Sequence, residues 1–130
     1  MKAIMFTALM LASLSVTAAD WVEIDRAAGK IVLLDAGSIK YSNSEKTQRQ
    51  AWVKLVMLDD SEYSKGDYTL SFNKFDCRSG AVKFNEILLY NSAGTLKTRT
   101  NLSDDGWRNI PSESNYGHIN ETVCSYPHLD

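Results

Sequence analysis

Two cysteines constrain this chain more than any other feature. Cys77 ends the run Tyr68–Cys77, in which apolar and polar residues alternate as they do along a half-buried strand. Cys124 lies near the C-terminus. A bond between them would tie the end of the chain to that strand. It would close a loop of about 47 residues and contribute roughly 4 kcal/mol in the loop-entropy model.

The apolar residues of this strand change parity near its end. They occupy even positions up to Phe72 and odd positions from Phe75 onward. One extra residue near Asn73 and Lys74, a β-bulge, would restore the phase. The alternative is a strand whose end is covered on both faces.

Residues 1–19 have the pattern of a signal peptide. Lys2 supplies a positive charge, and residues 4–14 form an apolar run that is too short to span a bilayer. Small residues at positions 16–19 then allow cleavage before Ala19 or Asp20, and no cysteine is present there to carry a lipid. We therefore expect an exported protein, periplasmic or at the cell surface or extracellular, without a lipid or other stable membrane anchor. The alternative is an N-terminal membrane anchor.

Residues 20–130 are enough for one small domain. The whole chain has a formal net charge of −2, and loss of Lys2 makes it more negative, so we expect no nucleic-acid partner. Export also places the two cysteines in an oxidising compartment, which favours a Cys77–Cys124 disulfide.

Alternating or continuous apolar runs predict six strands joined by short polar turns, which favours an antiparallel sheet. The polar composition of the last run is typical of an edge strand. In the fifth run we expect Val82, Phe84, Leu88 and Tyr90 to share one face. The predicted strands are residues 21–24, 30–35, 50–58, 68–77, 81–90 and 95–100.

A C-terminal helix is predicted after Pro111, with Ser112 or Ser114 as its N-cap. Its apolar positions follow helical spacing and include the second cysteine, so this cysteine should point toward the sheet. Gly117 lies inside the helix and costs about 1 kcal/mol relative to alanine. The residues on the apolar face are Tyr116, Ile119, Val123 and Cys124.

The predicted fold is α+β: a six-stranded antiparallel β-sheet with one C-terminal helix tethered by the disulfide. Such a sheet is roughly 29 Å wide, whereas a helix is about 10 Å wide. One helix cannot cover it, yet residues 50–58 carry apolar side chains on both faces. Either the sheet curls around the helix, or a second copy covers the rest. We expect a homodimer through the sheet, with Trp52 and Val56 at the contact.

No motif for chemistry is present in the chain. His118 and His128 are not spaced as a zinc pair, and the acidic run at 59–67 lacks the spacing of a calcium loop. We therefore expect a protein that is not an enzyme, with no catalytic residues, cofactor or metal. A basic patch from Lys97, Arg99 and Arg108 beside Trp107 is an alternative to an ordinary charged edge strand.

Short motifs in a fixed order resemble the surface-adhesin protein E family of Gram-negative bacteria. Together these motifs span nearly all of residues 20–130. They are Trp21; Asp35 with Ser38-Ile39; Ala51-Trp52-Val53-Lys54; Phe75-Asp76-Cys77; Tyr90 before Gly94; residues 107–112 (WRNIPS); and Val123-Cys124.

The resemblance implies an antiparallel sheet with a disulfide-tethered C-terminal helix. It also implies adhesion, through binding of host extracellular-matrix or serum proteins at the bacterial surface. The alternative is a soluble periplasmic binding or inhibitor protein with a partner in the envelope. The partner is a protein in either case, and the resemblance assigns no binding residue.

Overall fold

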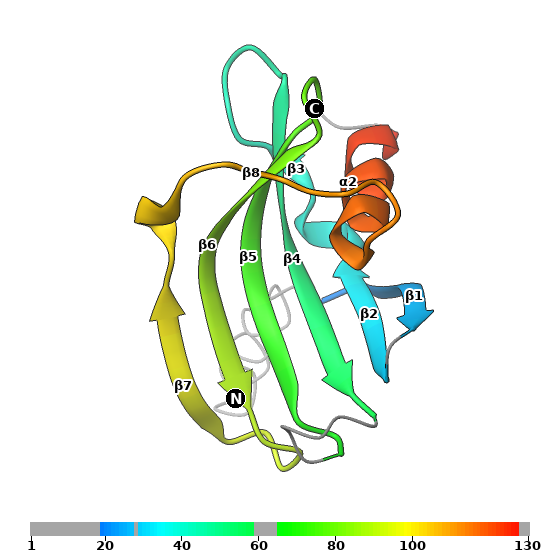
Figure 1. Cartoon of the computed structure of the whole chain (residues 1–130), viewed down its shortest axis with the longest axis vertical. Coiled ribbons are helices and arrows are strands. Elements are labelled where there is room, and N and C mark those ends of the chain that lie inside the picture. The colour runs from blue at the N-terminus through cyan, green and yellow to red at the C-terminus, as the bar shows by residue number, and fades with distance from the viewer. Residues whose placement is uncertain (1–18, 28, 59–64, 128–130) are drawn as a thin grey trace, which may run out of the picture.

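The computed structural model describes residues 19–27, 29–58 and 65–127, which form one curved antiparallel sheet with a helix against it (Figure 1). The predicted signal peptide lies outside the described residues except for Ala19. Residues 59–64 of the acidic run and His128 also lie outside them.

The described residues form eight strands, two more than predicted, in the order β1-β2-β4-β5-β6-β7. All paired strands are antiparallel, which confirms the predicted fold class. The additional strands β3 and β8 have two residues each and pair with β4 and β6. Such short pairings leave no periodic signal. The strands are β1 (Trp21–Ala27), β2 (Lys30–Asp35), β3 (Lys40–Tyr41), β4 (Gln48–Met57), β5 (Tyr68–Asp76), β6 (Ala81–Tyr90), β7 (Leu96–Asn101) and β8 (Arg108–Asn109).

The irregularity predicted near Asn73 exists, but the extra residue lies in the neighbouring strand. Phe72 pairs with Glu86 and Asn73 pairs with Phe84, so Asn85 of β6 is the bulged residue. The prediction of a bulge in β5 was therefore wrong. Strand β5 itself alternates regularly. Its apolar residues change parity because Phe72 and the apolar residues before it lie on one face of the sheet, whereas Phe75 lies on the other. Its buried residues are Ser71, Asn73 and Phe75.

The bulge at Asn85 divides the apolar residues of β6 between the two faces of the sheet. Val82 and Phe84 precede it and pack in the core beneath the helix. Leu88 and Tyr90 follow it and lie on the opposite face. We expected these four side chains on one face. That was wrong, because an inserted residue reverses the parity of everything beyond it.

Helix α2 (Asn115–Ser125) begins at Ser114, whose hydroxyl accepts a hydrogen bond from the N–H of Gly117 at 3.1 Å. Of the two predicted caps, Ser114 is therefore the N-cap. The helix ends just before Tyr126 and Pro127, as expected. Its apolar face supplies two fully buried side chains, which pack on residues of β2, β4, β5 and β6. This core comprises Val32, Leu34, Ile39, Ala51, Val53, Phe75, Val82, Ile119 and Val123.

The face of the sheet that packs against α2 is here called the helix face, and the other is called the opposite face. The helix contacts β1, β4 and β5. Figure 1 shows it beside one end of the sheet, while β7 forms the far edge. Every residue of β7 is exposed, which agrees with the predicted edge strand.

Candidate functional site

The disulfide joins Cys77, just beyond β5, to Cys124 in the last turn of α2. Its Cα atoms are 5.4 Å apart and its sulfurs 2.14 Å apart. It links the helix to the sheet, as predicted from the two cysteines. Because a helix of 11 residues is marginal by itself, this link and the packing of Ile119 and Val123 hold it on the sheet.

Arg49 of β4 holds the same end of the helix from another side. Its guanidinium donates hydrogen bonds to the carbonyls of Val123 at 2.7 Å and Tyr126 at 2.8 Å. It also lies over the ring of Tyr41, 5.1 Å from the centroid. The charge complements the negative end of the helix dipole. Sequence analysis did not find this residue, because its partners are carbonyls more than 70 positions away.

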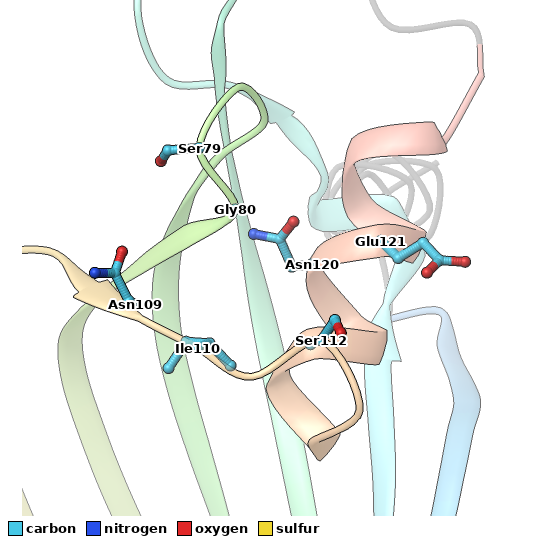
Figure 2. A pocket seen from close by; sticks show the side chains of 8 residues that line it. Ser79, Gly80, Asn109, Ile110, Ser112, Asn120 and Glu121 are labelled. Atoms are coloured by element: carbon cyan, nitrogen blue, oxygen red, sulfur yellow. The ribbon is translucent and has the colours of Figure 1, made fainter.

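A cavity of about 350 Å³, here called the strap pocket, lies beside the disulfide, between the helix and two other segments. Ser79 and Gly80 line it from the β5–β6 turn, and residues 109, 110 and 112 line it from the segment that crosses to the helix. Helix residues Gly117, Asn120 and Glu121 complete it (Figure 2).

The β5–β6 turn is held in a fixed conformation by Asp76. Its carboxylate accepts hydrogen bonds from the N–H groups of Arg78 at 2.9 Å and Ser79 at 3.3 Å. The first of these hydrogen bonds is the main reason that the pKa of Asp76 is lowered. Gly80 closes the turn with a φ of 81°, a conformation that favours glycine. This wall of the strap pocket is therefore preformed.

The second wall is the segment from β8 to the helix, held by Ser114 and Gly117. The Ser114 hydroxyl donates to the carbonyl of Pro111 at 2.7 Å. A Cβ on Gly117 would meet that same carbonyl oxygen at 2.3 Å. Gly117 has a low helix propensity, but because it lacks a Cβ it allows the segment before the helix to lie against the first turn of α2.

Asn120 forms the third wall and has an unsatisfied amide. Its Nδ2 is buried and has no hydrogen-bond partner. Its Oδ1 lies 3.6 Å from the Sγ of Cys124, but a disulfide sulfur has no proton to donate. In Figure 2 the side chain extends from the helix toward Gly80, whereas the Glu121 carboxylate points away. Buried amides without partners are rare and call for an explanation.

The opposite face carries an aromatic ladder of five rings and one cation. Trp52 and Phe72 lie 5.2 Å apart between centroids, and the stacked rings of Tyr68 and Tyr90 lie 5.0 Å apart. The ammonium group of Lys54 lies 4.5 Å from the Tyr68 ring and 5.6 Å from the ring of Trp21. Sequence analysis placed Trp52 on an uncovered face, but only the register of β4, β5 and β6 brings the rings together.

A buried polar group lies under the first turn of the helix. The hydroxyls of Tyr116 and Ser71 are 2.9 Å apart, and the amide of Asn73 donates to the Ser71 hydroxyl at 3.0 Å. Burial raises the pKa of the Tyr116 phenol. The Tyr116 ring also meets Phe84 edge to face, 4.8 Å between centroids. These contacts fix where the helix begins on the sheet.

His118 forms a hydrogen bond with a carboxylate on the edge strand β1. Its Nδ1 lies 3.0 Å from a carboxylate oxygen of Asp25 on β1. This hydrogen bond is the main cause of the lowered pKa of Asp25, followed by the N–H of Arg26. Within residues 19–27, 29–58 and 65–127, no group of three or more His, Cys, Asp or Glu side chains could hold a metal ion.

The three basic residues considered as a patch are partly neutralised. Arg99 pairs with Glu86 at 2.9 Å, and Arg108 pairs with Asp105 at 3.1 Å. Two of the three charges thus have acidic partners, which favours an ordinary charged surface over an anion site. Trp107 is 40% exposed.

In the part of the chain that the structure describes, no helix is long and apolar enough to cross a membrane.

Comparison with known proteins gives one match. The family model described as surface-adhesin protein E matches residues 21–125, which include every strand and the helix. Searches of curated proteins and of solved structures gave no match.

Proposed function

This chain belongs to the surface-adhesin protein E family, and from this membership we propose that it is an exported protein-binding module whose ligands are host extracellular-matrix or serum proteins. The observation that carries the proposal is the match over residues 21–125. The family points to binding rather than catalysis.

Immobilised ligands test the proposed function. Protein produced from the full-length chain and collected after export is passed over a panel of purified matrix and serum proteins, with ovalbumin as the control surface. We expect saturable binding to at least one panel protein, with micromolar or tighter affinity. Binding no stronger than to ovalbumin across the whole panel would contradict the proposal.

We also propose that the aromatic ladder is a contact between two copies of the chain. Tyr and Trp are enriched at interfaces, because their large rings bury much area with little loss of conformational freedom. The uncovered face also extends through partly buried residues of β2 and β4, such as Leu33 and Val56. Two-fold dimers are the commonest way to cover such a face.

Sedimentation equilibrium tests this dimer. We expect twice the chain mass at micromolar concentration, and a shift to monomer in Trp52→Glu and Val56→Glu. Ser125→Glu is the matched control, because Ser125 is exposed on the helix. A wild-type protein that stays monomeric at high concentration would contradict the dimer and favour a sheet that curls over itself.

A soluble periplasmic binding or inhibitor protein is the second candidate. It is favoured by the bond between Cys77 and Cys124, the two cysteines of this sequence, because neither is then available to carry a lipid. Protease treatment of intact cells separates the two candidates. A surface adhesin is digested in intact cells, whereas a periplasmic protein is digested only after the outer membrane is opened.

A further inference from the structure

We propose that the strap pocket binds a neutral side-chain carboxamide, that of an asparagine or glutamine, of the protein ligand. The inference rests on the proposed function for the identity of the ligand as a protein. The pocket itself is defined by its walls and by Asn120, independently of that function.

The size and rigidity of the strap pocket suit a small part of a protein. A volume of about 350 Å³ is near the lower end of the range for ligand sites, and it accommodates one or two amino-acid residues. Asp76 fixes the turn wall, Ser114 fixes the crossing segment, and the disulfide fixes the helix wall. A preformed pocket loses little entropy when a ligand enters.

The polar groups of the strap pocket specify a hydrogen-bond acceptor. The Nδ2 of Asn120 has no partner, and an unsatisfied buried donor costs about 1–3 kcal/mol. A carbonyl oxygen in the cavity would remove that cost. In the free protein this nitrogen is closed off from solvent, so the proposed contact requires the amide to turn about its terminal torsion, which has a broad energy minimum. Asn109 and Ser112 are exposed at the mouth and can donate or accept further hydrogen bonds.

The residues that line the strap pocket offer no positive charge to attract an anionic group and little negative charge to attract a cation. Among the described residues that line it, none is basic, and Glu121 is the one charged residue, with its carboxylate turned away from the cavity (Figure 2). No aromatic ring is among those lining residues, so a sugar would find no surface for stacking. A neutral amide suits this lining, because it carries no charge and offers both a carbonyl acceptor and an N–H donor.

Two matched probes test the chemistry of the strap pocket. The exported, ¹⁵N-labelled protein is titrated with N-acetyl-glutamine methylamide and with N-acetyl-glutamate methylamide, which differ only in a carboxamide or a carboxylate. We expect saturable shifts of the amide signals of Gly80, Asn109 and Asn120 with the first probe, at millimolar affinity. The second probe should bind at least tenfold more weakly. Equal binding of the two probes, or no shifts at these residues, would overturn the proposal.

Asn120→Asp is the decisive variant, because it keeps the shape and replaces the donor with an acceptor. We expect it to weaken binding of the carboxamide probe about tenfold. Asn101→Asp makes the same change at an exposed position of β7 and should bind like the wild type. Ser112→Tyr, at an exposed position, should block the mouth and give the same loss without any change at Asn120.

The protein ligand separates failure of the site from failure of the function. If a panel protein binds the wild type and is bound at least tenfold more weakly by Asn120→Asp and Ser112→Tyr, both proposals gain support. If it binds these variants as well as the wild type, the inference about the strap pocket is wrong and the proposed function stands. If no panel protein binds, the proposed function fails, and the probe titration alone decides whether the pocket is a site.

Discussion

The two faces of the sheet are built on different principles, although both are rich in apolar residues. On the helix face, α2 packs against part of the sheet and is held there by a disulfide, by Arg49 and by the hydroxyl of Tyr116. The opposite face carries paired rings and Lys54, and no described helix lies on it. The fully buried side chains of the helix face form the core. The ring pairs of the opposite face are only partly buried, so this face can release water when it binds a partner. We therefore expect the helix face to contribute most of the stability, and the opposite face is the one that we propose for association.

Removal of the disulfide should weaken the helix face most. In Cys77→Ala combined with Cys124→Ala, we expect the free energy of unfolding to fall by about 4 kcal/mol, because the unfolded chain regains the entropy of an open loop. Urea unfolding measures the loss. Hydrogen exchange should become faster in α2 than in β5 and β6. A loss below about 1 kcal/mol would mean that packing alone holds the helix.

A matched pair of phenylalanines on β5 compares the faces directly. Phe75 is fully buried on the helix face, and Phe72 is partly buried on the opposite face. Phe75→Ala should lower the free energy of unfolding by about 3.5 kcal/mol because it leaves a cavity. Phe72→Ala should lower it by about 1.5 kcal/mol in the monomer. Urea titrations at the same protein concentration measure both.

Protein concentration sharpens this comparison. If the opposite face joins two copies, the loss in Phe72→Ala should grow with protein concentration, since binding stabilises only the folded state. The loss in Phe75→Ala should change much less. Equal losses at all concentrations would remove the distinction between a core face and an association face.

The smallest effect concerns the contact between the helix and the edge strand β1. The His118 hydrogen bond lowers the pKa of Asp25 in the folded protein, so the folded state favours the carboxylate. The stability from this contact is present above the ordinary aspartate pKa of about 3.9, and it is lost as the pH falls through the lower folded pKa.

NMR titration of the Asp25 carboxyl carbon measures this pKa. In His118→Ala the pKa should rise toward the ordinary value, while Arg26→Ala serves as a control that keeps the histidine. The backbone N–H of Arg26, which also contacts Asp25, survives in that control. An unchanged Asp25 pKa in His118→Ala would show that the histidine does not hold the carboxylate.

The sequence by itself determined the parts of the fold that depend on local pattern. Alternation marked the six long strands, helical spacing marked the face of α2, and two cysteines in a chain with a predicted export signal indicated their bond. The strands and the helix follow from the residues within a few positions of each site, and the disulfide follows because two cysteines can form only one intramolecular bond. The family resemblance was carried by the same residues and is shown by the match over residues 21–125.

Tertiary structure decided the register and everything that depends on it. The bulge lies at Asn85 rather than in β5, because an inserted residue can be accommodated by either of two paired strands and the sequence pattern shows only the mismatch. The hydrogen bonds of Arg49 and the burial of the Asn120 amide without a partner both arise only when distant segments of the chain pack together. The strap pocket is likewise formed by three segments whose contact no local pattern specifies, because a cavity is a property of packed surfaces.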